Sequence, residues 1–474
     1  MFRRLLLPIL FLVLAAPAWP RRSGPFLVEP YLQLGADPGP DRLSLVWQGP
    51  DRAQDWAVAV RLAPGRSWVP VPGPRMVRVA VPATAPHRVY FAALRQLVPG
   101  AAFSYRIALG GRVVFQSHAR ALPGPGQRQR VAVVGDLAEG HGESRLMAWR
   151  LAQQRPDLVL VPGDVVYQGG RISEYRRNFF PVFNAGLAGP HWGAPLLRTT
   201  VVAAALGNHD VGERGPRHPV AEDPDGMAYY LYWDQPTNGP RQAPGPPLRP
   251  GPGWTWDGFR AAAGAHFPAM GSYSFDSGSV HWTVLDSNPY VRWDEPALQA
   301  WLERDLAAAA GASWRFVVFH HPAFSMAEGH RYRDQWMGRI WPILERHRVD
   351  LVFCGHIHIY ARTRPIRFTP DPASVARLDP RTQQGQLEGR LVWDTGFDGH
   401  RRTRADGIIQ ILTGGGGAQL RLRRRSARLR PHPYVARLVA DEHSFSLLDI
   451  QPRKVVFRQL DIRGRTLDRF TVTH

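Results

Sequence analysis

Residues 157–167 read Asp157-Leu-Val-Leu-Val-Pro-Gly-Asp164-Val-Val-Tyr167, an apolar run that ends in a carboxylate and a tyrosine. A short apolar run bounded by proline and glycine predicts a buried strand. In α/β sheets, ligand-binding side chains gather in the loops beyond the carboxyl ends of the strands. The segment therefore predicts a strand that carries Asp164 and Tyr167 into a binding site.

The same arrangement occurs at four other places along the chain. Apolar runs at 131–134, 201–206, 315–319 and 349–354 lead into Gly135-Asp136, Gly207-Asn208-His209-Asp210, His320-His321-Pro322 and Gly355-His356-Ile357-His358. Carboxylate, amide and phenolate oxygens with imidazole nitrogens suit hard or borderline metal ions. Two such ions can activate water for attack on phosphorus, so the motifs together indicate a dinuclear phosphoesterase site.

In this order the motifs resemble the calcineurin-like metallophosphoesterase superfamily. Its first carboxylate is usually followed two residues later by a ligand histidine, and Ala138 occupies that position here. The spacing of Asp164 and Tyr167 instead resembles the purple acid phosphatases, in which a tyrosinate binds a ferric ion. The absence of a histidine at position 138 and the presence of a tyrosine at position 167 both point to this subclass.

The resemblance implies a complete ligand set, with Asp164 bridging two ions. It assigns Asp136, Tyr167 and His358 to an Fe(III) ion, and Asn208, His320 and His356 to an Fe(II), Zn or Mn ion. The neutral amide of Asn208 leaves the second ion with less anionic charge, which suits a divalent ion. Because residues two apart in an extended or turning segment share a side, His356 and His358 can send their imidazoles toward neighbouring ions while Ile357 packs away.

Other histidines near these motifs receive separate roles. By resemblance His209 contacts the phosphate and protonates the leaving oxygen, as catalytic and substrate-binding residue. His330, ten residues after His320, is expected to bind substrate. His321 is expected to orient a neighbour or to face a buried polar contact, and Asp210 to hold His209 or a neighbouring loop.

The chain divides into two expected domains. Residues 24–122 contain short strands separated by Pro/Gly turns, without helical periodicity, which predicts an all-β sandwich of immunoglobulin or fibronectin type III kind. Residues 123–126, Pro-Gly-Pro-Gly, read as a linker. Strands alternate with helices in residues 129–474, and by family resemblance this α/β domain is a four-layer αββα sandwich.

Within the second domain we expect helices at 143–153, 295–309 and 334–347 and a β-hairpin at 271–288. Strands near 408–412, 434–439 and 454–461 are expected to complete its second sheet. A Pro/Gly-rich insertion at about 211–266 is expected to overhang the metal site as a rim, the alternative being a disordered segment.

The first residues have the layout of a secretory signal peptide, expected at 1–18. Arg3 and Arg4 precede an apolar run at 5–16, and Ala16-Pro17-Ala18 resembles a cleavage site. The apolar run is too short to span a bilayer. We therefore expect an exported protein, periplasmic or secreted, with the Sec and twin-arginine routes both open.

The chain has 474 residues and a formal net charge of +20, and its one cysteine, Cys354, lies in an apolar strand. An intrachain disulfide is therefore excluded, and a buried inert thiol is expected. The positive field favours anionic partners, including non-specific binding to anionic surfaces. The alternative explanation of the charge is a genome with biased base composition, which favours arginine codons. No motif indicates specific nucleic-acid binding, and the arginine run at 421–430 is expected to be a solvated loop.

The working hypothesis is an exported hydrolase of phosphomonoesters, acting through in-line attack of a metal-bound hydroxide on a phosphorylated small molecule. A phosphodiesterase or phospholipase-like enzyme with the same ligands is one alternative. An exported binding protein with a vestigial site is another, and the completeness of the ligand set argues against it.

Overall fold

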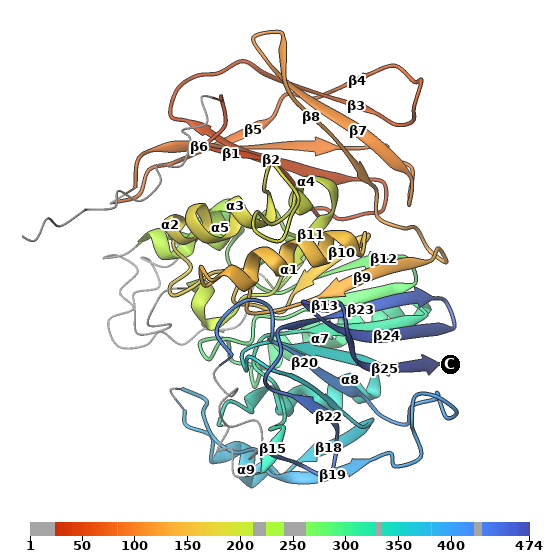
Figure 1. Cartoon of the computed structure of the whole chain (residues 1–474). Coiled ribbons are helices and arrows are strands. Elements are labelled where there is room, and N and C mark those ends of the chain that lie inside the picture. The colour runs from red at the N-terminus through yellow and green to blue at the C-terminus, as the bar shows by residue number, and fades with distance from the viewer. Residues whose placement is uncertain are drawn as a thin grey trace, which may run out of the picture.

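The structure is a computed structural model that describes residues 24–82, 84–211, 224–240, 262–328, 333–380, 382–420 and 429–474. Four expectations from the sequence fall wholly or partly outside these residues: the signal peptide, His330, most of the insertion at 211–266, and most of the arginine run at 421–430. Figure 1 shows a β-rich region at the amino-terminal end stacked on a larger region of sheets and helices.

The amino-terminal region consists of two antiparallel four-stranded sheets. One has the order β1 (Val28–Gln33), β2 (Leu43–Pro50), β6 (His87–Leu94), β5 (Arg75–Val79). The other has the order β4 (Val69–Val71), β3 (Trp56–Arg61), β7 (Ala102–Leu109), β8 (Arg112–Arg120). Trp47 from the first sheet packs against Trp56 from the second, with ring centroids 5.7 Å apart. An all-β sandwich is therefore present, and its kinship with fibronectin type III domains stays a prediction.

Specific hydrogen bonds join this sandwich to the rest of the chain. The hydroxyl of Tyr31 donates to the carbonyl of Tyr232 at 2.6 Å, and that of Tyr105 donates to the carbonyl of Arg198 at 2.8 Å. Arg198 also pairs with Glu29 at 2.7 Å. Because these polar groups are largely buried, their pairing fixes how the two parts meet.

The second region contains two larger sheets. The six-stranded sheet has the order β11 (Val201–Ala204), β10 (Leu158–Val161), β9 (Gln129–Val133), β23 (Ser444–Gln451), β24 (Lys454–Asp461), β25 (Thr466–Thr473). The seven-stranded sheet has the order β12 (Tyr273–Ser277), β13 (Val280–Val284), β14 (Trp314–Val318), β16 (Leu351–Cys354), β20 (Ile409–Thr413), β17 (Tyr360–Thr363), β22 (Val435–Val439). The strands that precede the motifs run parallel within each sheet.

Alternation along the buried strands builds four layers. Leu158 and Leu160 of β10 share one apolar cluster with Phe316 of the other sheet. Val159 and Val161 face the opposite way and belong to a second cluster, which holds the buried residues of α1 (Gly142–Gln153) and of α7 (Pro296–Ala308). Since successive strand residues point to opposite faces, the sheets meet on one side and the helices cover the other. The result is an α/β arrangement with helices outside two paired sheets.

Two expectations about this region were wrong in detail. The helix expected at 334–347 is a 3-10 helix at Trp336–Ile340 followed by α8 at Trp341–Arg346. Pro342 lies in the first turn of α8, where its missing N–H costs no hydrogen bond, so the α-helix begins there. Strand β24 joins the six-stranded sheet and not the second one, because it forms a hairpin with β23, which pairs with β9.

The remaining elements are short. They are α2 (Ile172–Glu174), the π-helix η1 (Tyr175–Phe179), α3 (Phe180–Phe183), α4 (Leu196–Thr199), α5 (Ala228–Tyr232), α9 (Pro372–Ala376), β15 (Ala327–Glu328), β18 (Ile366–Pro370), β19 (Gly389–Trp393), β21 (Arg430–Pro431), and the 3-10 helices η2 (Asn208–Val211), η4 (Pro224–Met227), η5 (Gly264–His266) and η6 (Ala309–Gly311). Within the described residues, no helix has both the length and the apolar composition that a membrane crossing requires.

Candidate metal centre

Five loops at the carboxyl ends of strands from both sheets converge on one site. They follow β9, β10, β11, β14 and β16, and they carry all seven expected metal ligands: Asp136, Asp164, Tyr167, Asn208, His320, His356 and His358. The structure thus brings together residues that are up to 222 positions apart in the sequence. Their polar atoms fall into two groups.

The first group surrounds the hydroxyl of Tyr167. This oxygen lies 2.9 Å from Oδ1 of Asp136 and 3.1 Å from Nε2 of His358. Nε2 of His358 lies 3.2 Å from Oδ1 of Asp136, which closes a triangle of donor atoms. Oδ2 of Asp164 completes the group at 3.2 Å from the hydroxyl.

The second group surrounds Oδ1 of Asn208. This oxygen lies 3.1 Å from Nε2 of His320 and 2.9 Å from Nδ1 of His356. Nε2 of His320 lies 3.2 Å from Oδ2 of Asp164, the oxygen that also belongs to the first group. Ligand atoms about 2.1 Å from one ion are about 3.0–3.4 Å apart, and the donor set combines oxygens with imidazole nitrogens. The residues therefore fit two metal ions that share one carboxylate oxygen.

Three of these residues adopt left-handed backbone conformations. The φ angles are 60° at Asp136, 53° at Asp164 and 71° at His356. Such conformations are unfavourable for residues with a side chain and persist where the surrounding structure enforces them. The observation marks the loops as strained to present these side chains.

Glycines beside the site leave room for the ligands. A Cβ on Gly207 would lie 2.2 Å from Oδ1 of Asp164, and a Cβ on Gly414 would lie 2.7 Å from Oδ2 of Asp136. Gly414 was not expected from the sequence. The four consecutive glycines at 414–417 directly after an apolar strand were the available signal.

Hydrogen bonds behind the site orient the imidazoles. Nδ1 of His320 donates to the carbonyl of Pro162 at 2.8 Å, and Nδ1 of His358 donates to the carbonyl of Gln419 at 2.7 Å. Each bond leaves the Nε2 lone pair facing the ligand group. His356 is turned the other way, with Nε2 3.3 Å from Oδ2 of Asp334 and Nδ1 facing the site. Neither Asp334 nor Gln419 stands in a recognisable motif, so the sequence carried no signal for them.

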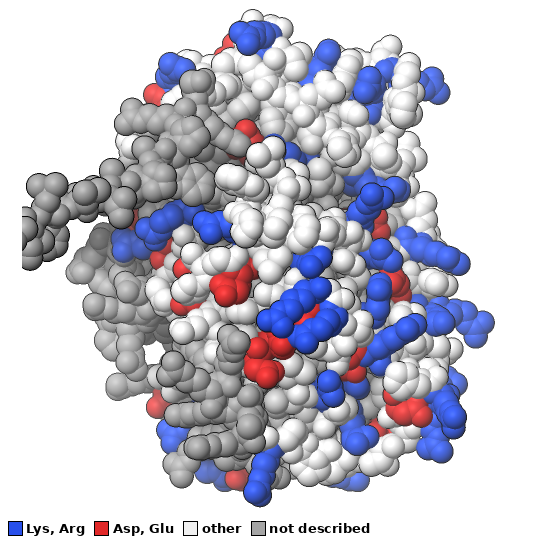
Figure 2. Space-filling view, in the orientation of Figure 1, with Lys and Arg blue, Asp and Glu red and all other residues white. Residues whose placement is uncertain are grey.

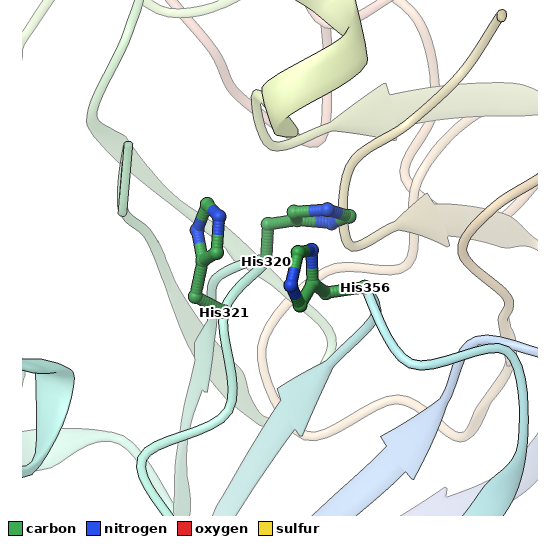
Figure 3. A group of neighbouring side chains, drawn as sticks. All are labelled: His320, His321 and His356. Carbon is green, nitrogen blue, oxygen red and sulfur yellow. The ribbon is translucent and has the colours of Figure 1, made fainter. Parts of the chain in front are cut away.

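His321 packs against the second ligand group, as Figure 3 shows with His320 and His356. Its ring centroid lies 4.5 Å from that of His356. Nδ1 of His321 lies 3.0 Å from the hydroxyl oxygen of Ser287, which also accepts the backbone N–H groups of His320 and His321. Burial lowers the pKa of His321, and the two neighbouring histidines lower it further, so its ring is neutral.

His209 stands at the edge of the first ligand group. Its backbone N–H donates to Oδ1 of Asp164 at 2.8 Å, and its ring centroid lies 4.6 Å from that of Tyr167. Nδ1 lies 2.6 Å from the carbonyl of Gln168. Asp210 accepts the backbone N–H groups of Val165 at 3.0 Å and of Gly207 at 2.9 Å, so it holds the loops and not the His209 ring.

Burial and charge set the protonation of the metal-free site. Burial raises the pKa of Tyr167 well above its ordinary value, and the carboxylates of Asp136 and Asp164 raise it further. Burial acts against charge on His320, but Asp164 outweighs it and raises the pKa of His320 to about 9. Without metals, Tyr167 stays a neutral phenol and a proton on His320 offsets part of the buried negative charge, which two cations would offset instead.

The fold and these residues place the protein in a known class. Residues 129–360 match the calcineurin-like phosphoesterase family. This region is therefore a calcineurin-like phosphoesterase region, and the resemblance to purple acid phosphatases that the motifs indicated agrees with the match to a purple acid phosphatase sequence.

Individual relatives support this placement. Purple acid phosphatase 23 of Arabidopsis thaliana is 36% identical over 268 residues, which cover 51% of this chain and 50% of that protein. The chain thus spans about half the length of this curated relative. The structure of purple acid phosphatase PPD1 from yellow lupin (Lupinus luteus) seeds matches with a TM-score of 0.64 at 17% identity, over 94% of this chain and 74% of that one. The structure of PhoD matches with a TM-score of 0.53 at 13% identity, over 96% of this chain and 94% of that one. These two structural matches show the fold.

Proposed function

We propose that this protein hydrolyses phosphomonoesters with two metal ions held by the seven converging residues. The observation that carries the proposal is Oδ2 of Asp164, which is shared by the two ligand groups at 3.2 Å from the Tyr167 hydroxyl and 3.2 Å from Nε2 of His320. Ions bound on either side of this oxygen would polarise the phosphoryl group and lower the pKa of water, which is the chemistry of two-metal phosphoester hydrolysis.

The donor types support different ions in the two groups. The first group contains a phenol and two carboxylates, whose anionic oxygens favour a trivalent ion, and we assign Fe(III) to Asp136, Asp164, Tyr167 and His358. The second group replaces the phenol with the neutral amide of Asn208. We assign Fe(II), Zn or Mn to that group.

The chain's own residues supply the proton for the leaving oxygen. Nδ1 of His209 is used in a hydrogen bond to the carbonyl of Gln168. Nε2 is then the nitrogen that can give a proton to the leaving group. The ring packs on Tyr167, so the imidazole stands beside a residue of the first ligand group. His330 keeps its proposed role in substrate binding.

We further propose that the mature protein is exported, with a phosphorylated small molecule or another anionic species as its substrate. Basic side chains are spread over the face in Figure 2 and are frequent along the side formed by β24 and β25. This distribution supports attraction of anions in general and no specific nucleic-acid interface. Fractionation of cells that express the full chain tests export, and intact protein confined to the cytoplasm would contradict it.

Metal analysis combined with a phosphoesterase screen tests the proposed reaction. The purified full-length protein is expected to contain two metal ions per chain and to hydrolyse a phosphomonoester faster than a phosphodiester. A diester preference would favour the phosphodiesterase alternative. Stoichiometric metal without hydrolysis of either ester would favour the binding-protein alternative.

A further inference from the structure

A pocket of about 710 Å³ lies next to the candidate metal centre. Tyr167 and Gln168 form the wall that it shares with the first ligand group, α1 contributes Arg145, and η1 contributes Arg176 and Arg177. Its volume is within the range of about 300–1,000 Å³ that is typical of small-molecule sites. The pocket therefore has room for a substrate group beyond the reacting phosphate.

The three arginines of this pocket carry charge that the protein does not neutralise. Among the described residues, Arg145, Arg176 and Arg177 make no ion pair. Arg176 donates to the amide oxygen of Gln48 at 3.2 Å, and its Nε is buried without an acceptor. The pocket therefore carries guanidinium charge that an anionic ligand can pair with.

Two carboxylates also line the pocket, and both are engaged elsewhere. Glu139 accepts the backbone N–H of Gln419 at 2.7 Å. Glu174 accepts the backbone N–H groups of Gly169 at 3.1 Å and of Arg171 at 2.9 Å. Because these oxygens are used to hold loops, they do not pair with the arginines. The pocket is therefore suited to an anion.

The position of His209 relates the pocket to the reaction. The His209 ring packs on Tyr167 and bonds to the carbonyl of Gln168, and both of these residues line the pocket. A residue that protonates the leaving oxygen marks the side on which the leaving group departs. The leaving portion of a bound substrate would therefore extend into the pocket.

We propose that this pocket binds a second phosphate on the leaving portion of the substrate, so that the preferred substrate is a small molecule with at least two phosphate groups. This inference rests on the hydrolase function proposed above and specifies its substrate class. Guanidinium groups match phosphate oxygens in shape and charge, and three of them around one pocket favour a phosphate over an uncharged group.

Binding and kinetics of metal-loaded full-length protein test the proposal. Calorimetry compares 1,5-pentanebisphosphonate with pentylphosphonate, since neither has an ester bond to hydrolyse. Kinetics compare kcat/KM for fructose 1,6-bisphosphate and phenyl phosphate. The test variant is Arg145→Gln with Arg177→Gln. The matched control is Arg390→Gln with Arg437→Gln, which removes the same charge from exposed positions on β19 and β22.

The wild-type protein should bind the bisphosphonate at least about 10-fold more tightly and show a similar preference in kcat/KM. The pocket variant should lose both preferences, and the control should keep them. The pocket proposal is overturned if the wild type shows no preference in binding, or if the pocket variant keeps it. Binding preference without hydrolysis of either ester would overturn the hydrolase proposal and leave the pocket assignment standing. Equal hydrolysis of both esters without a binding preference would overturn the pocket proposal and leave the hydrolase proposal standing.

Discussion

Oδ2 of Asp164 lies 3.2 Å from Nε2 of His320, and this contact joins the two ligand groups of the site. The carboxylate is buried, and its other oxygen accepts the backbone N–H of His209 at 2.8 Å. Burial alone would raise the pKa of Asp164, but His320 and His209 outweigh it, so the pKa lies well below its usual value. The carboxylate is thus ionised and positioned before any metal binds.

Replacing this carboxylate by an amide should disable both ion sites at once. Asp164→Asn keeps the shape of the side chain and removes the charge that two cations would share. We expect loss of both metals and a fall in phosphoesterase kcat of at least about 10³-fold, measured by metal analysis and steady-state kinetics. Asp55→Asn, at an exposed position of the amino-terminal region, is the control. Two metals and wild-type turnover in Asp164→Asn would refute the bridging role.

The phenol of Tyr167 should give the protein its colour. A tyrosinate bound to Fe(III) absorbs visible light, and Tyr167→Phe removes the only phenol oxygen among the seven proposed ligands. We expect the visible band of the iron-loaded protein to disappear in this variant. Tyr105→Phe also removes a buried phenol, one that bonds to the carbonyl of Arg198, and should keep the band. An unchanged spectrum in Tyr167→Phe would exclude tyrosinate ligation.

A single methyl group at Gly207 should disturb the metal site. A Cβ there would lie 2.3 Å from the backbone nitrogen of Asp164, as well as against its carboxylate, so backbone must move. Gly207→Ala should therefore bind metal at least about 10-fold more weakly, since displacement of groups around a metal typically costs 10–100-fold. Gly73→Ala, where a Cβ meets nothing within 4 Å, is the control. Equal metal affinities of the two variants, from calorimetric titration, would contradict the expected clash.

Stability should depend on pH through His281, which lies in the β12–β13 hairpin and is not one of the proposed metal ligands. Its ring nitrogens lie 2.8 Å from Asp276 and 3.1 Å from Asp305. Burial opposes its charge, but hydrogen bonds to these carboxylates raise its pKa from 6.5 to about 9. A raised pKa in the folded state stabilises the protein below pH 6.5, and this stabilisation is lost as the pH rises through 9.

Urea unfolding at several pH values measures this contribution. The wild type should lose about 2 kcal/mol of unfolding free energy between pH 6 and pH 10 that His281→Gln does not lose. His118→Gln, at an exposed position on β8, should behave like the wild type. If His281→Gln shows the same pH dependence as the wild type, the charged pair does not form.

Much of the fold and of the candidate site was predictable from local sequence. Buried strands such as β10 and β16 consist of uninterrupted apolar residues, and each ends at glycine and polar side chains within a few positions. The type and order of those side chains, Tyr167 in particular, are properties of the chain itself and do not depend on its folding. They were sufficient to predict the metallophosphoesterase class.

Non-local contacts decided the rest. The family resemblance assigned His356 and His358 to different ions, but only folding places Nδ1 of His356 beside Asn208 and Nε2 of His358 beside Asp136. The pairing of β24 with β23 and the support of His358 by the carbonyl of Gln419 also join distant segments. A sequence pattern shows which side chains a segment carries and which local structure it favours, because both depend on neighbours along the chain. Which groups meet, and which of the described arginines form no ion pair, depends on packing between segments, and that exists only in the tertiary structure.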